Sequence, residues 1–109
     1  MRESHTAVLE RWTRLHGHWE TEPYEVAWAD ELIWFVHLSE PHQVDVPLTP
    51  QLSADGRRWV DDTDAATVLP AGVTDIAVRQ RHFGGWSRLV LDLPSVEGPR
   101  IDIYLSAKE

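Results

Sequence analysis

Histidines and carboxylates are the side chains in this sequence whose types could do acid–base or metal chemistry. The chain has six histidines and no cysteine, which excludes thiolate zinc sites, cysteine nucleophiles and disulfide frameworks. His16 and His18 stand two residues apart, so both would lie on one face of an extended segment. Three histidines could converge on a metal in the folded chain, but their spacing does not require it. We therefore expect no bound metal and no cofactor.

Motifs for calcium binding and for catalysis are also missing. The acidic cluster of Asp61, Asp62 and Asp64 lacks the glycine and the glutamate that an EF-hand loop needs, so a solvated loop is expected there. The sequence contains no Gly-rich phosphate loop, no G-x-S-x-G nucleophile elbow and no H-E-x-x-H helix. We expect a protein that is not an enzyme.

The length and the charge balance restrict the class of protein and its partners. A chain of 109 residues corresponds to one domain. Its net charge of −8 and its pI of about 5.1 repel nucleic acids and anionic lipids, so neither is an expected partner. The sequence has no apolar run long enough to cross a membrane, and its first residues lack the basic-then-apolar order of a signal peptide. We expect a cytoplasmic protein.

The first part of the chain has a helical pattern. Thr6 or Ser4 could cap a segment in which apolar residues recur at helical spacing, and Gly17 is a suitable stop. The apolar positions of this segment are Ala7, Val8, Leu9, Trp12 and Leu15. The pattern predicts a short N-terminal helix or arm within residues 1–19, followed by a single β-domain over residues 20–109.

Beyond residue 20 the apolar residues alternate with a period of two or form short runs, which is typical of strands. Residues 32–38 are almost continuously apolar, which predicts a strand buried on both faces. Pro47 and Pro50 place the strand that contains them at an edge or at a bulge. The expected strands lie within residues 24–29, 32–38, 44–52, 57–60, 73–83, 86–93 and 101–106. About seven antiparallel strands with turns between them predict an all-β, jelly-roll-like β-sandwich.

A short motif supports this fold class. Ser53, Asp55, Gly56 and Trp59 form an S-x-D-G-x-x-W pattern. The pattern resembles a hairpin of the discoidin-type jelly rolls, the coagulation-factor C-domain-like modules. The resemblance implies that Asp55 and Gly56 make the turn and that Trp59 packs inward. It covers about seven residues and implies no binding residue.

Six tryptophans are unusually many for a chain of this length. The pattern assigns Trp12 to the apolar stripe of the helix, and Trp28 and Trp34 to the core. The other three lie near expected turns or strand ends: Trp19, Trp59 and Trp86. Tryptophans at such rims serve both sugar-binding modules and protein interfaces, while a small core also needs large side chains. The sequence leaves these uses open.

The segment from Arg79 to Leu93 predicts a hairpin around Gly84-Gly85. A two-residue loop would set Phe83 opposite Trp86 and Arg81 opposite Arg88, with Arg79 on the same face. Arginines directly opposed on one face repel each other unless an anionic group lies between them. The face could hold solvated arginines, a protein interface, or a stacked carbohydrate or small anion.

The function that follows is a non-enzymatic structural or assembly subunit. An acidic protein with one arginine-rich aromatic face is self-complementary, so we expect a homo-oligomer formed through that face and the N-terminal arm. Other protein subunits remain possible partners. The alternative is a carbohydrate-binding β-sandwich module that uses rim tryptophans. The expected binding residues are Arg79, Arg81, Phe83, Trp86, Arg88, Trp12, Trp19 and Trp59.

Overall fold

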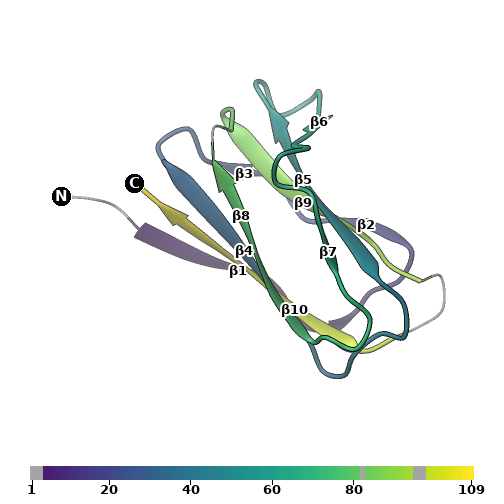
Figure 1. Cartoon of the computed structure of the whole chain (residues 1–109). Helices are drawn as coiled ribbons and strands as arrows, with labels where there is room; N and C mark the ends of the chain where they lie inside the picture. The colour runs from purple at the N-terminus through teal and green to yellow at the C-terminus, as the bar shows by residue number, and fades with distance from the viewer. Residues whose placement is uncertain (1–3, 82, 95–97) are drawn as a thin grey trace.

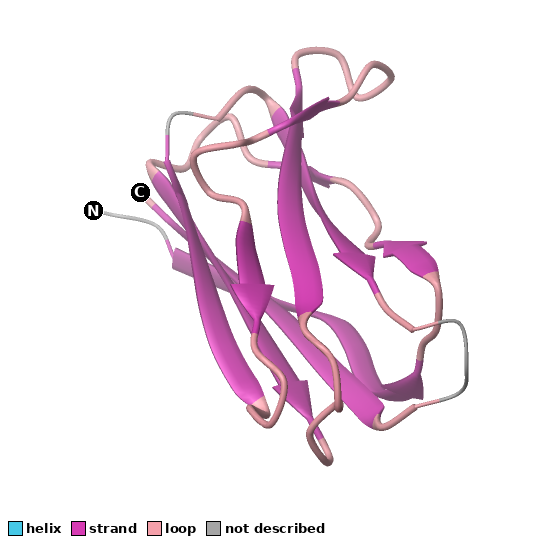
Figure 2. Ribbon diagram, turned by 45° about the vertical axis from the view of Figure 1, so that its right-hand side comes forward, coloured by secondary structure: helices cyan, strands magenta, loops and turns pink. Residues whose placement is uncertain are grey.

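The computed structural model describes residues 4–81, 83–94 and 98–109. Within these ranges every regular element is a strand, and the strands form two antiparallel sheets packed face to face (Figures 1 and 2). The all-β prediction is therefore confirmed. None of the described segments is a helix that could span a membrane.

Sheet A has four strands and sheet B has six. The strands of sheet A lie in the order β1 (Ser4–Arg14), β10 (Arg100–Lys108), β4 (Glu31–Leu38) and β8 (Asp75–Arg81). Sheet B has the order β2 (His18–Glu20), β9 (Trp86–Asp92), β5 (Val46–Ser53) and β6 (Val60–Asp61), with β3 (Tyr24–Glu25) paired to β9 and β7 (Thr67–Leu69) paired to β5. The described chain thus has ten strands rather than about seven, because β1, β2 and β7 were not expected as strands.

The predicted N-terminal helix is wrong. Ser4–Arg14 is a strand that pairs along β10, from Ser4 opposite Lys108 to Arg14 opposite Arg100. A short helix gains little stability by itself, whereas the edge of β10 offers a row of backbone hydrogen bonds. Register shifts after Val8 and after Glu10 absorb the helix-like spacing of the apolar residues, because each bulge re-aims the side chains that follow it.

The core lies between the two sheets and follows the alternation of side chains along each strand. In β4, Leu32, Trp34 and Val36 are fully buried, while Phe35 is 43% exposed. The expectation that residues 32–38 are buried on both faces is therefore wrong. The outward side chain of Phe35 is open to solvent, and only the inward residues of β4 belong to the core cluster.

The predicted pairing of residues 73–83 with residues 86–93 is also wrong. β8 pairs with β4 in sheet A, while β9 pairs with β5 in sheet B, so the chain crosses from one sheet to the other after Arg81. Gly84 lies so close to β5 that an added Cβ would stand 3.0 Å from the Ser53 carbonyl oxygen. The predicted inward positions are confirmed for Val78 and Leu89. His82, also predicted inward, lies outside the described residues.

Candidate functional site

The outer side of sheet A carries an apolar row that crosses all four strands. Val8, Tyr104, Phe35 and Ala77 stand directly opposite one another in successive strands. Side chains of paired residues project from the same face of a sheet. Val8 is 47% exposed and Phe35 is 43% exposed, so the row is open to solvent. We call the outward side of these four strands the sheet A face.

Polar side chains flank the apolar row on both sides, and on the side of Arg79 they are joined by Ile33 of β4. On one side, Asp102, His37 and Asp75 stand in register across β10, β4 and β8. On the other side, β8 presents Arg79 and then Arg81, whose Nη2 atom lies 3.2 Å from a carboxylate oxygen of Glu31. The sheet A face thus has an apolar centre, an acidic end and a basic edge.

A hollow of about 290 Å³ opens beside β8 on the sheet A face. Its lining residues are Phe35, Val36, His37, Asp75, Ile76 and Ala77. One wall is fixed, because His37 Nδ1 lies 2.6 Å from Asp75 Oδ1 and the Thr74 hydroxyl donates to Asp75 Oδ2 at 2.7 Å. These two hydrogen bonds, with Thr74 contributing more, lower the pKa of Asp75. The hollow therefore has an apolar floor beside an ionised rim.

Trp12 stands at the opposite edge of sheet A and is 53% exposed. It lies in the bulge of β1, where Arg11 and Trp12 together oppose Asp102. Its backbone φ of +55° is rare for a residue other than glycine. The Trp12 N–H donates to Asp102 Oδ1, and Arg100 Nη1 donates to the Trp12 carbonyl oxygen at 2.9 Å. Two side chains of β10 thus hold the backbone of an exposed tryptophan.

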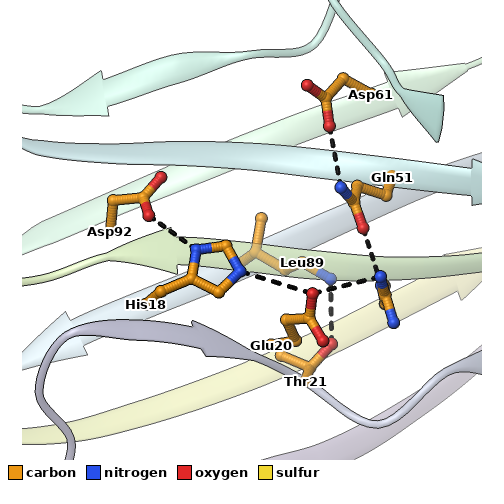
Figure 3. Close-up of polar contacts among 8 residues, drawn as sticks. His18, Glu20, Thr21, Gln51, Asp61, Leu89 and Asp92 are labelled. Carbon is orange, nitrogen blue, oxygen red and sulfur yellow. Dashed lines mark hydrogen bonds and ion pairs between the residues drawn. The ribbon is translucent and has the colours of Figure 1, made fainter. Parts of the chain in front are cut away.

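The outer side of sheet B carries a chain of polar contacts that crosses four strands (Figure 3). We call it the polar ladder; its members are Asp92, His18, Glu20, Arg88, Gln51 and Asp61. His18 lies 2.8 Å from Asp92 and 3.4 Å from Glu20. Arg88 lies 3.2 Å from Glu20 and donates through Nε to Gln51 at 2.8 Å. Every member of the ladder therefore has a partner inside it.

The Trp59 ring makes a cation–π contact with Arg88 of the polar ladder. Its ring centroid lies 4.3 Å from the Arg88 guanidinium carbon. Hydrogen bonds of the imidazole to Asp92 and, second, to Glu20 raise the pKa of His18, because the carboxylates accept from its protonated form. The side chains of the polar ladder are hydrogen-bonded or ion-paired to one another. The ladder is therefore suited to holding neighbouring strands of sheet B together. Within the described ranges no group of three or more metal-ligating side chains is arranged to hold a metal ion.

The eight predicted binding residues do not share one surface. Arg79 and Arg81 lie on the sheet A face and Trp12 at its edge, whereas Arg88 and Trp59 meet on the outer side of sheet B. The predicted opposition of Arg81 and Arg88 is wrong, because Arg81 stands opposite Glu31 and Arg88 opposite Gln51. The remaining three are partly buried: Trp19 and Phe83 pack against the core, and Trp86 lies beside Gly56.

The discoidin-like motif is confirmed for its turn but not for its tryptophan. Asp55 Oδ1 accepts hydrogen bonds from the backbone N–H groups of Arg57 and Arg58, and Gly56 has a φ of +80°. These backbone bonds, Arg58 first, lower the pKa of Asp55. Trp59 does not pack inward, because it covers Arg88 on the outer side of sheet B.

Three residues of the sheet A face are not among the binding residues predicted from the sequence: Val8, Phe35 and Tyr104. Val8 was assigned to a helix, and Phe35 to a doubly buried strand. The sequence does carry a signal for such residues. In a strand whose alternate residues are apolar and point inward, a further apolar residue between them must point outward, as Tyr104 does between Ile103 and Leu105.

Comparisons with known proteins find similar solved structures but no similar sequence family. No protein-family model matches the chain, and no curated protein sequence matches it. The PBSX exported protein XepA has a TM-score of 0.72 at 13% identity over 94% of this chain. The chain spans only 36% of XepA's length.

Two further structures match along most of both chains. The SPBc2 prophage-derived protein YomS has a TM-score of 0.62 at 9% identity, covering 100% of this chain and 96% of its own. A protein from Bacillus endospore appendages, described as disulfide-linked pili, has a TM-score of 0.58 at 8% identity, covering 99% and 85%. At identities this low, these matches show a shared fold.

Proposed function

We propose that this protein is a non-enzymatic structural subunit that associates with further copies of itself through the sheet A face. The observation that carries the proposal is the apolar row of Val8, Tyr104 and Phe35, in which Val8 and Phe35 are exposed. Burying apolar surface gains roughly 25 cal/mol per Å², and contiguous apolar patches rimmed by polar residues mark interaction sites. The row runs across the middle of the sheet A face, where a flat partner can cover it.

The size and the charges of the sheet A face favour a second copy as the partner. The molecule extends over 41 × 29 × 21 Å, so its broad side exceeds the roughly 800 Å² per partner of a standard interface. The face also carries both signs of charge, with Asp75 and Asp102 at one end and Arg79 at the other. A second copy therefore supplies matching apolar and charged groups at once.

The structural neighbours support an assembly role. One of them is the prophage-derived protein YomS, and another comes from endospore appendages described as disulfide-linked pili. This chain has no cysteine, so association between its copies would not use disulfide links of this sequence. The carbohydrate alternative has no comparable support, because Trp19, Trp59 and Trp86 are all partly buried.

Light scattering after size-exclusion chromatography tests the proposal with two matched variants. Phe35→Lys places a charge in the apolar row, while Val44→Lys changes a side chain that is 53% exposed elsewhere. We expect the wild type and Val44→Lys to share a mass above 12.5 kDa, and Phe35→Lys to elute folded at 12.5 kDa. A Phe35→Lys variant that keeps the wild-type mass contradicts the proposal, as does a wild type that is monomeric throughout. Circular dichroism checks folding.

A further inference from the structure

We infer that this association closes at two copies, with the Trp12 ring of each copy seated in the hollow between Phe35 and Asp75 of the other. The inference rests on the proposed function and adds the symmetry of the complex and its anchor residue. It follows from the hollow on the sheet A face and from the exposed Trp12 at the opposite edge of sheet A.

Trp12 and the hollow lie at opposite edges of the sheet A face and at the same level along the strands. Trp12 opposes Asp102, which pairs with His37, which in turn pairs with Asp75 at the rim of the hollow. Neighbouring strands lie about 4.8 Å apart, so β1 and β8 are separated by roughly 14 Å. A two-fold axis parallel to the strands, between β10 and β4, exchanges the two edges and preserves the level. The Trp12 contact is then made twice.

The same rotation brings complementary groups face to face. It lays β10 of one copy over β4 of the other, so that Tyr104 meets Phe35 at the centre of the interface. Asp102 then faces the partner's His37, and Lys108 faces the partner's Glu31. At the margins, Val8 faces the partner's Ala77. Among these four pairs, none sets like charges against each other.

Trp12 has the properties of an interface anchor. Tryptophan is among the residue types that contribute most to binding when seated in a pocket. Its backbone is held by Asp102 and Arg100 in a conformation with φ +55° that costs folding free energy. The strained backbone keeps a large apolar ring at the solvent-exposed edge, where the intrachain core gains nothing from it.

Closure at two copies follows from the shared face. The hollow lies on the sheet A face, as does Asp102, which accepts the Trp12 N–H at the edge of that face, so one partner seated there reaches both the hollow and Trp12. In an isologous contact of this kind both copies use the same surface. Once two copies have paired, that surface is covered and cannot bind a third copy.

Trp12→Gly separates the ring's role in binding from a role in folding. Glycine accepts a φ of +55° without strain, so the variant should unfold at the same temperature as the wild-type monomer or higher. Its dimer dissociation constant, measured by sedimentation, should rise at least about 30-fold, as expected for a hot-spot residue. Val60→Gly, which removes a side chain that is 59% exposed in β6, should leave the dissociation constant unchanged. A dimer that survives Trp12→Gly overturns the inference.

Cross-linking between single-cysteine variants tests the symmetry, because the chain has no cysteine of its own. Packed sheets lie about 10 Å apart, so a thiol-specific cross-linker of about that length suits facing residues. Val8→Cys mixed with Ala77→Cys should give a cross-linked heterodimer, and neither variant alone should cross-link. Self-linking of Val8→Cys would instead show an axis across the strands, and no cross-link in a stable dimer would also reject the arrangement.

The two proposals fail in distinguishable ways. A wild type that stays at 12.5 kDa rejects the proposed function and with it the dimer. A wild type that dimerises, loses its dimer in Phe35→Lys and keeps it in Trp12→Gly rejects only the anchor and its symmetry. A wild-type mass above that of two chains rejects closure at two copies.

Discussion

The side-chain oxygen of Gln80 accepts a hydrogen bond of 2.9 Å from the Ser87 hydroxyl, although β8 and β9 belong to opposite sheets. The same oxygen accepts a 3.1 Å bond from Trp34 Nε1, so one buried carboxamide joins three strands. Gln80 is 1% exposed and Ser87 is fully buried. This polar contact ties the two sheets together at the point where the chain crosses between them.

Gln80→Leu should destabilise the protein by about 1–3 kcal/mol, because it leaves the buried Trp34 N–H without an acceptor. Ser87 is less affected, since its hydroxyl can still donate to the Gln51 carbonyl oxygen at 3.0 Å. Urea unfolding of wild type and variant measures the difference. A variant as stable as the wild type would show that packing alone holds the two sheets at this point.

Leu89→Ala should cost about 2–5 kcal/mol, since Leu89 is fully buried in the core. Val90→Ala should cost less, about 1–2 kcal/mol. Val90 is only 3% exposed but lies on the outer side of sheet B, and the change removes two methyl groups there. Equal losses at the two positions in denaturant unfolding would contradict the facing assigned to β9.

The pH dependence of the polar ladder follows from His18. Asp92 and Glu20 raise the pKa of His18 in the folded state above its ordinary value of about 6.5. The stability that these contacts of His18 contribute is therefore fully present below the pKa of His18 in the unfolded chain. It is lost as pH rises through the pKa of His18 in the folded protein. Asp92→Asn should lower the His18 pKa measured by NMR, and should destabilise more at about pH 5.5 than at about pH 8.5. An unchanged His18 titration in Asp92→Asn would refute this assignment.

Gly56→Ala and Gly17→Ala form a matched pair at two positive-φ glycines. Each should lose about 1–2 kcal/mol for placing alanine in the left-handed region. Gly56→Ala should lose more, because its Cβ would stand 3.3 Å from Trp86 Cε2, while nothing lies within 4 Å of the position at Gly17. Thermal unfolding gives the comparison. Equal losses of stability in Gly17→Ala and Gly56→Ala would contradict the prediction, because they would mean that the Trp86 ring moves away from the added methyl group at no cost.

The side-chain alternation of the fold was predictable from the sequence, and the strand partners were not. Val78 and Leu89 were assigned to the interior correctly, because the period of two is local. Whether β8 pairs with β9 or with β4 depends on contacts far along the chain, and the Gly84-Gly85 turn fits a crossing between sheets as well as a hairpin. For Ser4–Arg14, pairing with β10 overrides the helical spacing.

The candidate site was predictable only in part for the same reason. Arg79 and Arg81 were placed correctly on an outward side of their strand. Their neighbours were not, because Phe35 and Tyr104 reach the same face only through pairings that join residues distant in sequence. Arg88 was grouped with them by a register that the crossing to sheet B abolishes.

Sedimentation equilibrium of the wild-type protein over a concentration series is the most direct test of self-association through the sheet A face. Wild type should move with concentration from the 12.5 kDa of one chain toward twice that mass, and Phe35→Lys should stay at one chain throughout. A wild type that remains at 12.5 kDa up to about 100 μM, where even a weak interface would be occupied, would contradict the account.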